Sequence, residues 1–188
     1  FRTRVDISGD LAPVFAPAYQ PFFGPEVSLR AAITSRPDGN IALDDLTLQA
    51  AALALDGRAV VAQGQPQEID IAGRIANPGG GAVLLPLSGP ETRVDAIDVA
   101  VTFDAAQSED WQGIFSIDGL TRDGFSAETL QLDGTGRIAP GVATANFNFE
   151  ANALDLGDPD AEEALGETVT GAAQIDWSTD APISISQL

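Results

Sequence analysis

The densest group of side chains that could bind a ligand is a set of four acidic residues near the C-terminus. They are Asp158, Asp160, Glu162 and Glu163. Carboxylates are the ligands that Ca²⁺ prefers, but the spacing here does not match an EF-hand loop. The same segment suits a helix start, with Asp158 as cap, Pro159 in the first position and acids near the positive end of the dipole. We predict a helix from Asp158 to Leu165, ended by Gly166, and no metal site.

Catalytic chemistry has few candidate residues in this chain. It contains no His, Cys or Met, which removes the commonest general base, the commonest metal ligand and every thiolate. Asp44 and Asp45 are adjacent, and neighbours on a strand point to opposite faces, so they cannot flank one bond. The loop Gly79–Gly81 lacks the Lys and Ser/Thr of a phosphate-binding loop. We predict that the protein is not an enzyme and needs no cofactor.

Two tryptophans, Trp111 and Trp177, could stack on a sugar. Residues so far apart do not make a platform by themselves, and a Trp in a sheet protein more often packs at a sheet edge. We predict the packing role for both.

The charge of the chain is strongly negative, with 9 Lys+Arg against 28 Asp+Glu and a formal net charge of −19. Such a chain repels phosphate backbones and anionic lipid surfaces, which excludes nucleic acid as a partner. Hydrophobic residues make up 44% of the sequence, too many for a disordered acidic tail. The negative charge instead keeps an apolar, sheet-rich protein in solution.

The elements that must position any site are strands, because apolar residues recur with period two along most of the chain. Each run places one strand face against something apolar and the other toward water. The apolar members that we predict to line one common face are Ile41, Leu43, Leu53, Leu55, Ile69, Ile71, Val99, Val101, Phe103, Phe115, Ile117, Leu130, Leu132, Phe147 and Phe149.

We predict that short turns separate these runs, among them Asp56-Gly57, Asp118-Gly119, Asp123-Gly124 and Asp133-Gly134. Asp-Gly pairs tolerate the positive φ of tight hairpins. About a dozen strands fit, and no βαβ spacing appears. We predict an all-β fold, an elongated antiparallel meander with two short helical segments.

The first helical segment spans Asp10 to Phe23, where apolar residues have helical spacing but prolines recur. Pro17 and Pro21 prevent a regular helix, so we expect a broken helix or successive turns. Its apolar and aromatic residues could insert into lipid or plug a groove. We favour a role in covering one end of a local core by the residues Val14, Phe15, Tyr19, Phe22 and Phe23.

An internal repeat relates the two helical segments at an offset of 142 residues, the distance from Gly24 to Gly166. The offset places Val27 on Val169 and Ile41 on Ile183, and it keeps the phase across two turns. We interpret residues 1–188 as one segment of a repetitive array, with units starting near 10 and near 155. A start at Phe1 and an end within a unit lead us to expect an internal fragment of a longer protein.

Several segments resemble alphaproteobacterial members of the TamB family, the translocation and assembly module subunits related to AsmA. These are the Pro- and Phe-rich stretch 11–24, the stretch 83–94 and the block 156–166, together with the Leu- and Asp-rich phrases 43–48 and 53–57. The resemblance covers nearly the whole chain, although repetitive Leu/Asp/Gly strands recur in other AsmA-like proteins.

The resemblance implies a β-taco, a sheet curled lengthwise into a groove with an apolar interior. It implies a periplasmic location within a protein anchored in the inner membrane of a Gram-negative bacterium. It also implies phospholipid transport to the outer membrane, in which acyl chains would occupy the groove. A role in outer-membrane protein assembly with a TamA-type barrel would follow, through regions outside residues 1–188.

The alternation alone favours a different interpretation, in which the same residues fill the core of a closed β-sandwich or barrel. Such a domain, or a β-solenoid, would be an interaction or adhesion module without bound lipid. The repeat and the resemblance together favour the open groove. A groove predicts an open sheet with unequal faces, whereas a closed module predicts a dry core.

Overall fold

The computed structural model describes residues 1–188 except 38, 88, 140–141, 179–180 and 187–188. The side chains of 138–139, 142–143, 159, 161–162, 176–178 and 181–186 also lie outside the described set. In the part of the chain that is described, no helix has the length and apolarity needed to cross a membrane.

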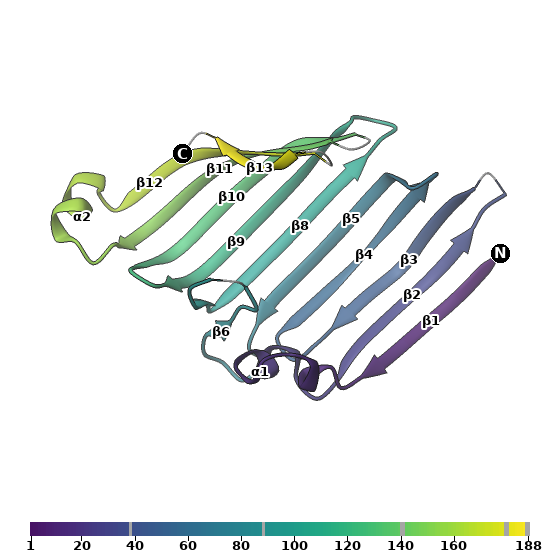
Figure 1. Cartoon of the computed structure of the whole chain (residues 1–188), viewed down its shortest axis with the longest axis horizontal. Coiled ribbons are helices and arrows are strands. Elements are labelled where there is room, and N and C mark those ends of the chain that lie inside the picture. Colours follow the sequence, from purple (N-terminus) through teal and green to yellow (C-terminus); the bar gives the residue numbers. More distant parts are fainter. Residues whose placement is uncertain (38, 88, 140–141, 179–180, 187–188) are drawn as a thin grey trace.

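One antiparallel sheet of thirteen strands makes up most of the molecule (Figure 1). Eleven strands follow one another across it in chain order, and the short strands β6 (Val83–Leu84) and β7 (Thr92–Val94) lie off this path. The eleven are β1 (Arg2–Gly9), β2 (Val27–Ser35), β3 (Asn40–Gln49), β4 (Leu53–Ala62), β5 (Gln65–Ala76), β8 (Ala96–Asp104), β9 (Asp110–Arg122), β10 (Phe125–Ala139), β11 (Val142–Asp155), β12 (Thr168–Ser178) and β13 (Ala181–Ser186). The predicted meander is confirmed, but the turns predicted at Asp56-Gly57, Asp118-Gly119 and Asp133-Gly134 are wrong, because these pairs lie within β4, β9 and β10. Asp56 and Gly57, for example, pair with Ala72 and Ile71 of β5.

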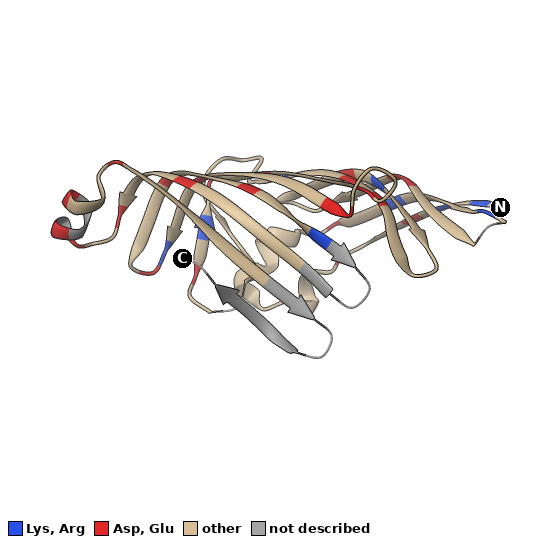
Figure 2. Ribbon diagram, turned by 90° about the horizontal axis from the view of Figure 1, so that it is seen from above, with Lys and Arg blue, Asp and Glu red and all other residues tan. Residues whose placement is uncertain are grey.

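The sheet is open and curled. Among the described strands, β1 and β13 each pair on one side only, at opposite ends of the strand order. Viewed from above, the sheet is arched rather than flat (Figure 2). The predicted elongated, curled meander is therefore the observed architecture, and the sheet is neither a sandwich nor a closed barrel.

The register gives the sheet two unlike faces, because residues directly opposite in an antiparallel pair point to the same side. Val99 lies opposite Phe115, Phe115 opposite Leu132, and Leu132 opposite Phe149. One step along, Asp98 lies opposite Ser116 on the other side of the sheet. One face is therefore continuously apolar across these neighbouring strands, and the other mixes polar and charged side chains with apolar ones such as Ala100 and Ile114.

The segment between β1 and β2 forms successive short turns, as the prolines predict. It comprises the 3₁₀ turns η1 (Ala12–Val14) and η2 (Pro17–Tyr19) and the helix α1 (Gln20–Phe23). Gly24 ends α1 at a φ of 67°. The backbone N–H groups of Ala51 and Ala52 donate to the carbonyls of Phe23 and Phe22 at 3.1 and 3.0 Å, which ties this segment to the turn between β3 and β4.

The second predicted helix is also present, as α2 (Pro159–Leu165). The N–H of Asp160 donates to the Asp158 carboxylate at 3.1 Å, and Gly166 follows at a φ of 77°. Like the first helical segment, α2 stands between two strands, here β11 and β12. An offset of 142 carries β2 onto β12 and the start of β3 onto β13. The division into repeat units remains a prediction.

A buried core lies at one end of the strands, where α1 and β6 sit (Figure 1). We call residues 12–23, 83–87 and 92–94 the cap. The buried core comprises Phe22, Ala52, Val83, Leu85, Val94, Leu120 and Ala127. Its members come from the cap, from the residue before β4, and from β9 and β10, so the cap covers only part of the apolar face.

Candidate functional site

All fifteen residues predicted to line a common face lie on the same side of the sheet. The register carries this face from strand to strand: Leu43 lies opposite Ala59, Ala59 opposite Ile69, and Ile69 opposite Phe103. Alternation along each strand then brings the remaining members to this side. Their assignment to lipid binding remains a prediction.

The exposure of this face is intermediate, as expected for large side chains on a sheet with one layer. Ile41 is 46% exposed and Phe103 is 5% exposed. The other thirteen fall between buried and exposed. Residues of a closed, dry core would be almost fully buried, so most of this face keeps contact with solvent.

The cap divides the fifteen residues into two groups. Leu53, Ile117 and Leu130 pack against the buried core and belong to its packing. We call the other twelve the trough residues. They are Ile41, Leu43, Leu55, Ile69, Ile71, Val99, Val101, Phe103, Phe115, Leu132, Phe147 and Phe149. The apolar face is thus a local core at the cap and a partly exposed surface beyond it, in which Phe103 alone among the twelve is buried.

An aromatic group stands on the open part of the face at β9 to β11. The Trp111 indole nitrogen donates to the carbonyl of Thr144 at 3.2 Å, so the ring reaches across β10. Its ring centroid lies 5.9 Å from that of Phe147, which lies 6.1 Å from that of Phe115. Trp111 belongs to an interior strand, so our prediction of sheet-edge packing is wrong for it. The side chain of Trp177 lies outside the described set.

Glycines make room for these rings. A Cβ atom at Gly134 would lie 2.8 Å from carbons of both Phe147 and Trp111. Because real Cβ atoms do not approach so closely, these rings lie directly on the backbone of β10. Sequence reasoning missed Trp111 as part of the face, although the pattern Gly134-Thr-Gly136 beside an aromatic strand was a signal.

The opposite face carries the charge. Arg58 contacts Glu68 and lies 3.9 Å from Asp70, and Arg74 contacts Asp98. Acidic residues are spread along the sheet in Figure 2. The trough residues include no charged side chain, so the two faces differ in chemistry as well as in exposure.

These surface ion pairs are predicted to contribute little to stability. The side chains of Arg74 and Asp98 are 55% and 49% exposed, and exposed pairs typically contribute about 0.2–1 kcal/mol. We expect Arg74→Gln to lower the free energy of unfolding by less than about 1 kcal/mol in urea denaturation. A much larger loss would show that the polar face has a structural role that its exposure does not suggest.

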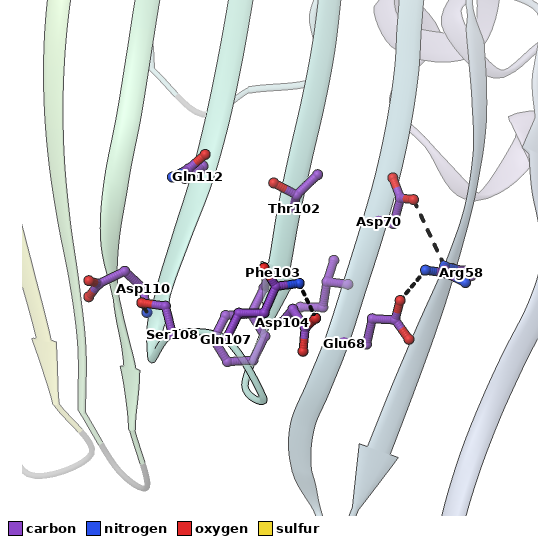
Figure 3. Close-up of a pocket in the computed structure, with 11 residues that line it drawn as sticks. Arg58, Glu68, Asp70, Thr102, Phe103, Asp104, Gln107, Ser108, Asp110 and Gln112 are labelled. Atoms are coloured by element: carbon purple, nitrogen blue, oxygen red, sulfur yellow. Dashed lines mark hydrogen bonds and ion pairs between the residues drawn. The ribbon is translucent and has the colours of Figure 1, made fainter.

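A polar hollow of about 310 Å³ lies at the turn between β8 and β9 (Figure 3). Three of its four acidic groups have partners: Gln107 donates to Asp104 at 2.7 Å, and Arg58 contacts Glu68 and lies 3.9 Å from Asp70. Within the described residues, no group of three or more His, Cys, Asp or Glu is arranged to hold a metal ion. The hollow therefore shows ordinary surface polar contacts and no arrangement for a metal ion among these residues.

Asp44 and Asp45 do not point to opposite faces as predicted. Asp45 has a φ of 52°, and the register shifts between Leu43 and Leu46, so β3 contains a bulge here. Thr34 donates to the Asp44 carboxylate at 3.3 Å, and Arg2 lies 3.5 Å from that of Asp45. Thr34 and Arg2 are register partners, so both carboxylates lie on the polar side, each with its own partner.

The aromatic residues of the cap cover the core, as predicted for most of them. Phe22 is buried, Phe23 packs against the core, and Phe15 stacks on Phe23 with centroids 3.7 Å apart. The Tyr19 hydroxyl donates to the carbonyl of Leu87 at 3.1 Å and joins the two parts of the cap. Val14 is the exception, because it is 78% exposed.

Known proteins give no direct guide to this face. No family model, no curated protein and no solved structure matches the chain. What the face binds has to be argued from its own residues.

Proposed function

We propose that the trough residues bind the acyl chains of phospholipids, and that the chain is one segment of a lipid-transfer groove of the TamB type. The observation that carries the proposal is an apolar face that the cap leaves uncovered: twelve apolar side chains on one side of an open sheet, all of them partly exposed except the buried Phe103. A contiguous exposed apolar surface of this kind marks an interaction site.

The energetics favour acyl chains as the occupant. Each CH₂ group exposed to water is unfavourable by about 0.8 kcal/mol, so a chain of about 15 carbons is unfavourable by roughly 12 kcal/mol. A continuous apolar face removes much of this along its length. The trough residues are aliphatic or phenyl groups without charge, which offer many weak contacts and no single deep site. Such contacts suit movement along the face.

The wider cellular role rests on the family resemblance. A TamB-like protein anchored in the inner membrane would place this segment in the periplasm, between the two membranes. Phospholipid would move along it toward the outer membrane. Outer-membrane protein assembly with a TamA-type barrel would use regions beyond residues 1–188. Nothing in this proposal requires a catalytic step or a cofactor.

Native mass spectrometry of the purified chain, followed by organic extraction of bound molecules, tests the proposal. We expect co-purified phospholipid. The double variant Val101→Asp/Leu132→Asp places two charges in the trough and should remove the lipid, because a carboxylate on an apolar path is strongly disfavoured. Circular dichroism checks that the variant is folded.

The matched control uses the polar side of the same two strands. Thr102 and Gln131 are exposed neighbours of Val101 and Leu132, so Thr102→Asp/Gln131→Asp adds the same charge without touching the trough. It should keep the bound lipid. A lipid-free chain that also fails to take up a fluorescent acyl probe would overturn the proposal in favour of a lipid-free interaction module.

A further inference from the structure

An apolar cavity, separate from the trough residues, lies where the cap meets the loop between β5 and β6. Its volume is about 730 Å³, within the roughly 300–1,000 Å³ of small-molecule sites. Phe22 and Val83 of the buried core form part of its wall, and the small residues Ala18, Ala51 and Ala82 form much of the rest. None of the fifteen predicted face residues lines it, so it is a separate space with its own wall.

The charge of this cavity is the reverse of the charge of the protein. Among the described lining residues, Arg93 is the one charged side chain, in a chain of formal net charge −19. The other polar side chain of the lining is Asn77, whose Oδ1 accepts the N–H of Gly79 at 2.9 Å. The cavity thus combines an apolar wall with a single cation.

Arg93 lines both this cavity and a neighbouring hollow that it shares with Glu91 and Arg122, and its guanidinium has an exposed acidic partner. The guanidinium lies 3.3 Å from the carboxylate of Glu91, but the two side chains are 46% and 69% exposed. Exposed pairs of this kind are weak, and Glu91 does not line the cavity. An incoming carboxylate can therefore replace or share this contact, and Arg presents two parallel donors that match a carboxylate.

We propose that this cavity binds a single-chain anionic amphiphile, a fatty carboxylate, with its tail against Phe22, Val83 and the alanines and its carboxylate on Arg93. The apolar wall selects an alkyl tail, and the lone cation selects the negative head. The inference does not depend on lipid binding in the trough, because the two sites share no residue among those described.

Isothermal titration of the full chain with decanoate tests the proposal, with decanol as the uncharged probe of the same tail length. We expect one decanoate per chain. Arg93→Gln should weaken decanoate binding about tenfold, since a hydrogen bond to a charged group contributes energy of that order. Decanol should bind less tightly than decanoate and should not respond to Arg93→Gln.

Two further variants test whether the cavity itself holds the probe. Arg122→Gln removes the same charge from β9 next to β7, does not alter the cavity lining, and should keep decanoate affinity within about twofold of the unmodified chain. Ala82→Phe fills the cavity from an exposed position and should abolish binding of both probes.

Equal effects of Arg93→Gln and Arg122→Gln would overturn the proposal, because they would indicate attraction by overall charge. Decanoate binding that survives Ala82→Phe but is lost in Val101→Asp/Leu132→Asp would place the ligand in the trough and would also overturn it. Loss of phospholipid from the trough variant with intact decanoate binding would support two separate sites.

Discussion

Replacing Phe22 by Ala is expected to lower the free energy of unfolding by about 3–5 kcal/mol, the usual loss for a buried phenyl ring. Phe22 is 7% exposed, and its ring meets that of Phe23 edge to face with centroids 5.1 Å apart. The same cluster contains Val83 and Val94, so the ring joins both parts of the cap to the sheet. Urea denaturation followed by circular dichroism measures the loss.

The matched control lies in the same segment. Val14 is apolar but 78% exposed, so Val14→Ala should change the free energy of unfolding by less than about 0.5 kcal/mol. Phe22→Ala should also increase binding of an apolar fluorescent dye, because Leu53, Ile75 and Ile97 pack against this core. Equal losses from the two variants would contradict the assignment of the core to the cap.

The period-two pattern was enough to predict the two faces of the sheet. Side chains alternate along any strand, so Ile69 and Ile71 share one side, as do Val99 and Val101. A register that gathers the apolar side chains of both strands on one face is favoured, and the structure has it, with Ile71 opposite Val101. Turn chemistry was a weaker guide. Asp123-Gly124 does join β9 to β10, but the other three Asp-Gly pairs lie inside strands, where pairing with the neighbouring strands overrides their preference for a turn. Long, strongly periodic elements of this kind depend little on tertiary context.

The cap could not be predicted in full, because it depends on a contact between segments far apart in the sequence. The stretch Val83 to Leu85 is apolar, but nothing in its sequence indicates that it meets Phe22. Tyr19 and Leu87 are joined by a hydrogen bond across 68 positions. Long-range contacts of this kind leave no periodic trace in a single sequence.

Local departures from regular strand geometry could not be predicted from the sequence either. Asp45 and Ala153 have φ values of 52° and 50°, in the left-handed region that residues other than glycine rarely adopt. At Asp45 this conformation accompanies a bulge and moves a carboxylate to the side that strict alternation forbids. Alternation predicts faces only where a strand is regular, and Asp44-Asp45 is a place where it is not.

The Trp111 side chain extends across β10, a contact that the sequence did not reveal. This contact also gives a reason why the open face can keep its shape without a second layer of structure. Gly134 and Gly136 look like weak points in a strand, since glycine packs nothing itself. Here they admit the indole, whose N–H then bonds to Thr144 on the next strand but one. An aromatic ring lying over a glycine supplies the packing that the glycine lacks.

Gly136→Ala should therefore be among the most damaging single-methyl changes in the chain. A Cβ at this position would lie 1.9 Å from the carbonyl oxygen of Thr144 and 2.6 Å from the Trp111 indole nitrogen, so backbone or ring must move. We expect a loss of about 3 kcal/mol or more in the free energy of unfolding, with a red-shifted Trp111 emission measured in a Trp177→Phe background.

Gly9→Ala is the control, because a Cβ there meets nothing within 4 Å, and it should leave both stability and emission unchanged. If Gly136→Ala behaved like Gly9→Ala, Trp111 could not lie against β10, and the aromatic part of the open face would have to be built differently.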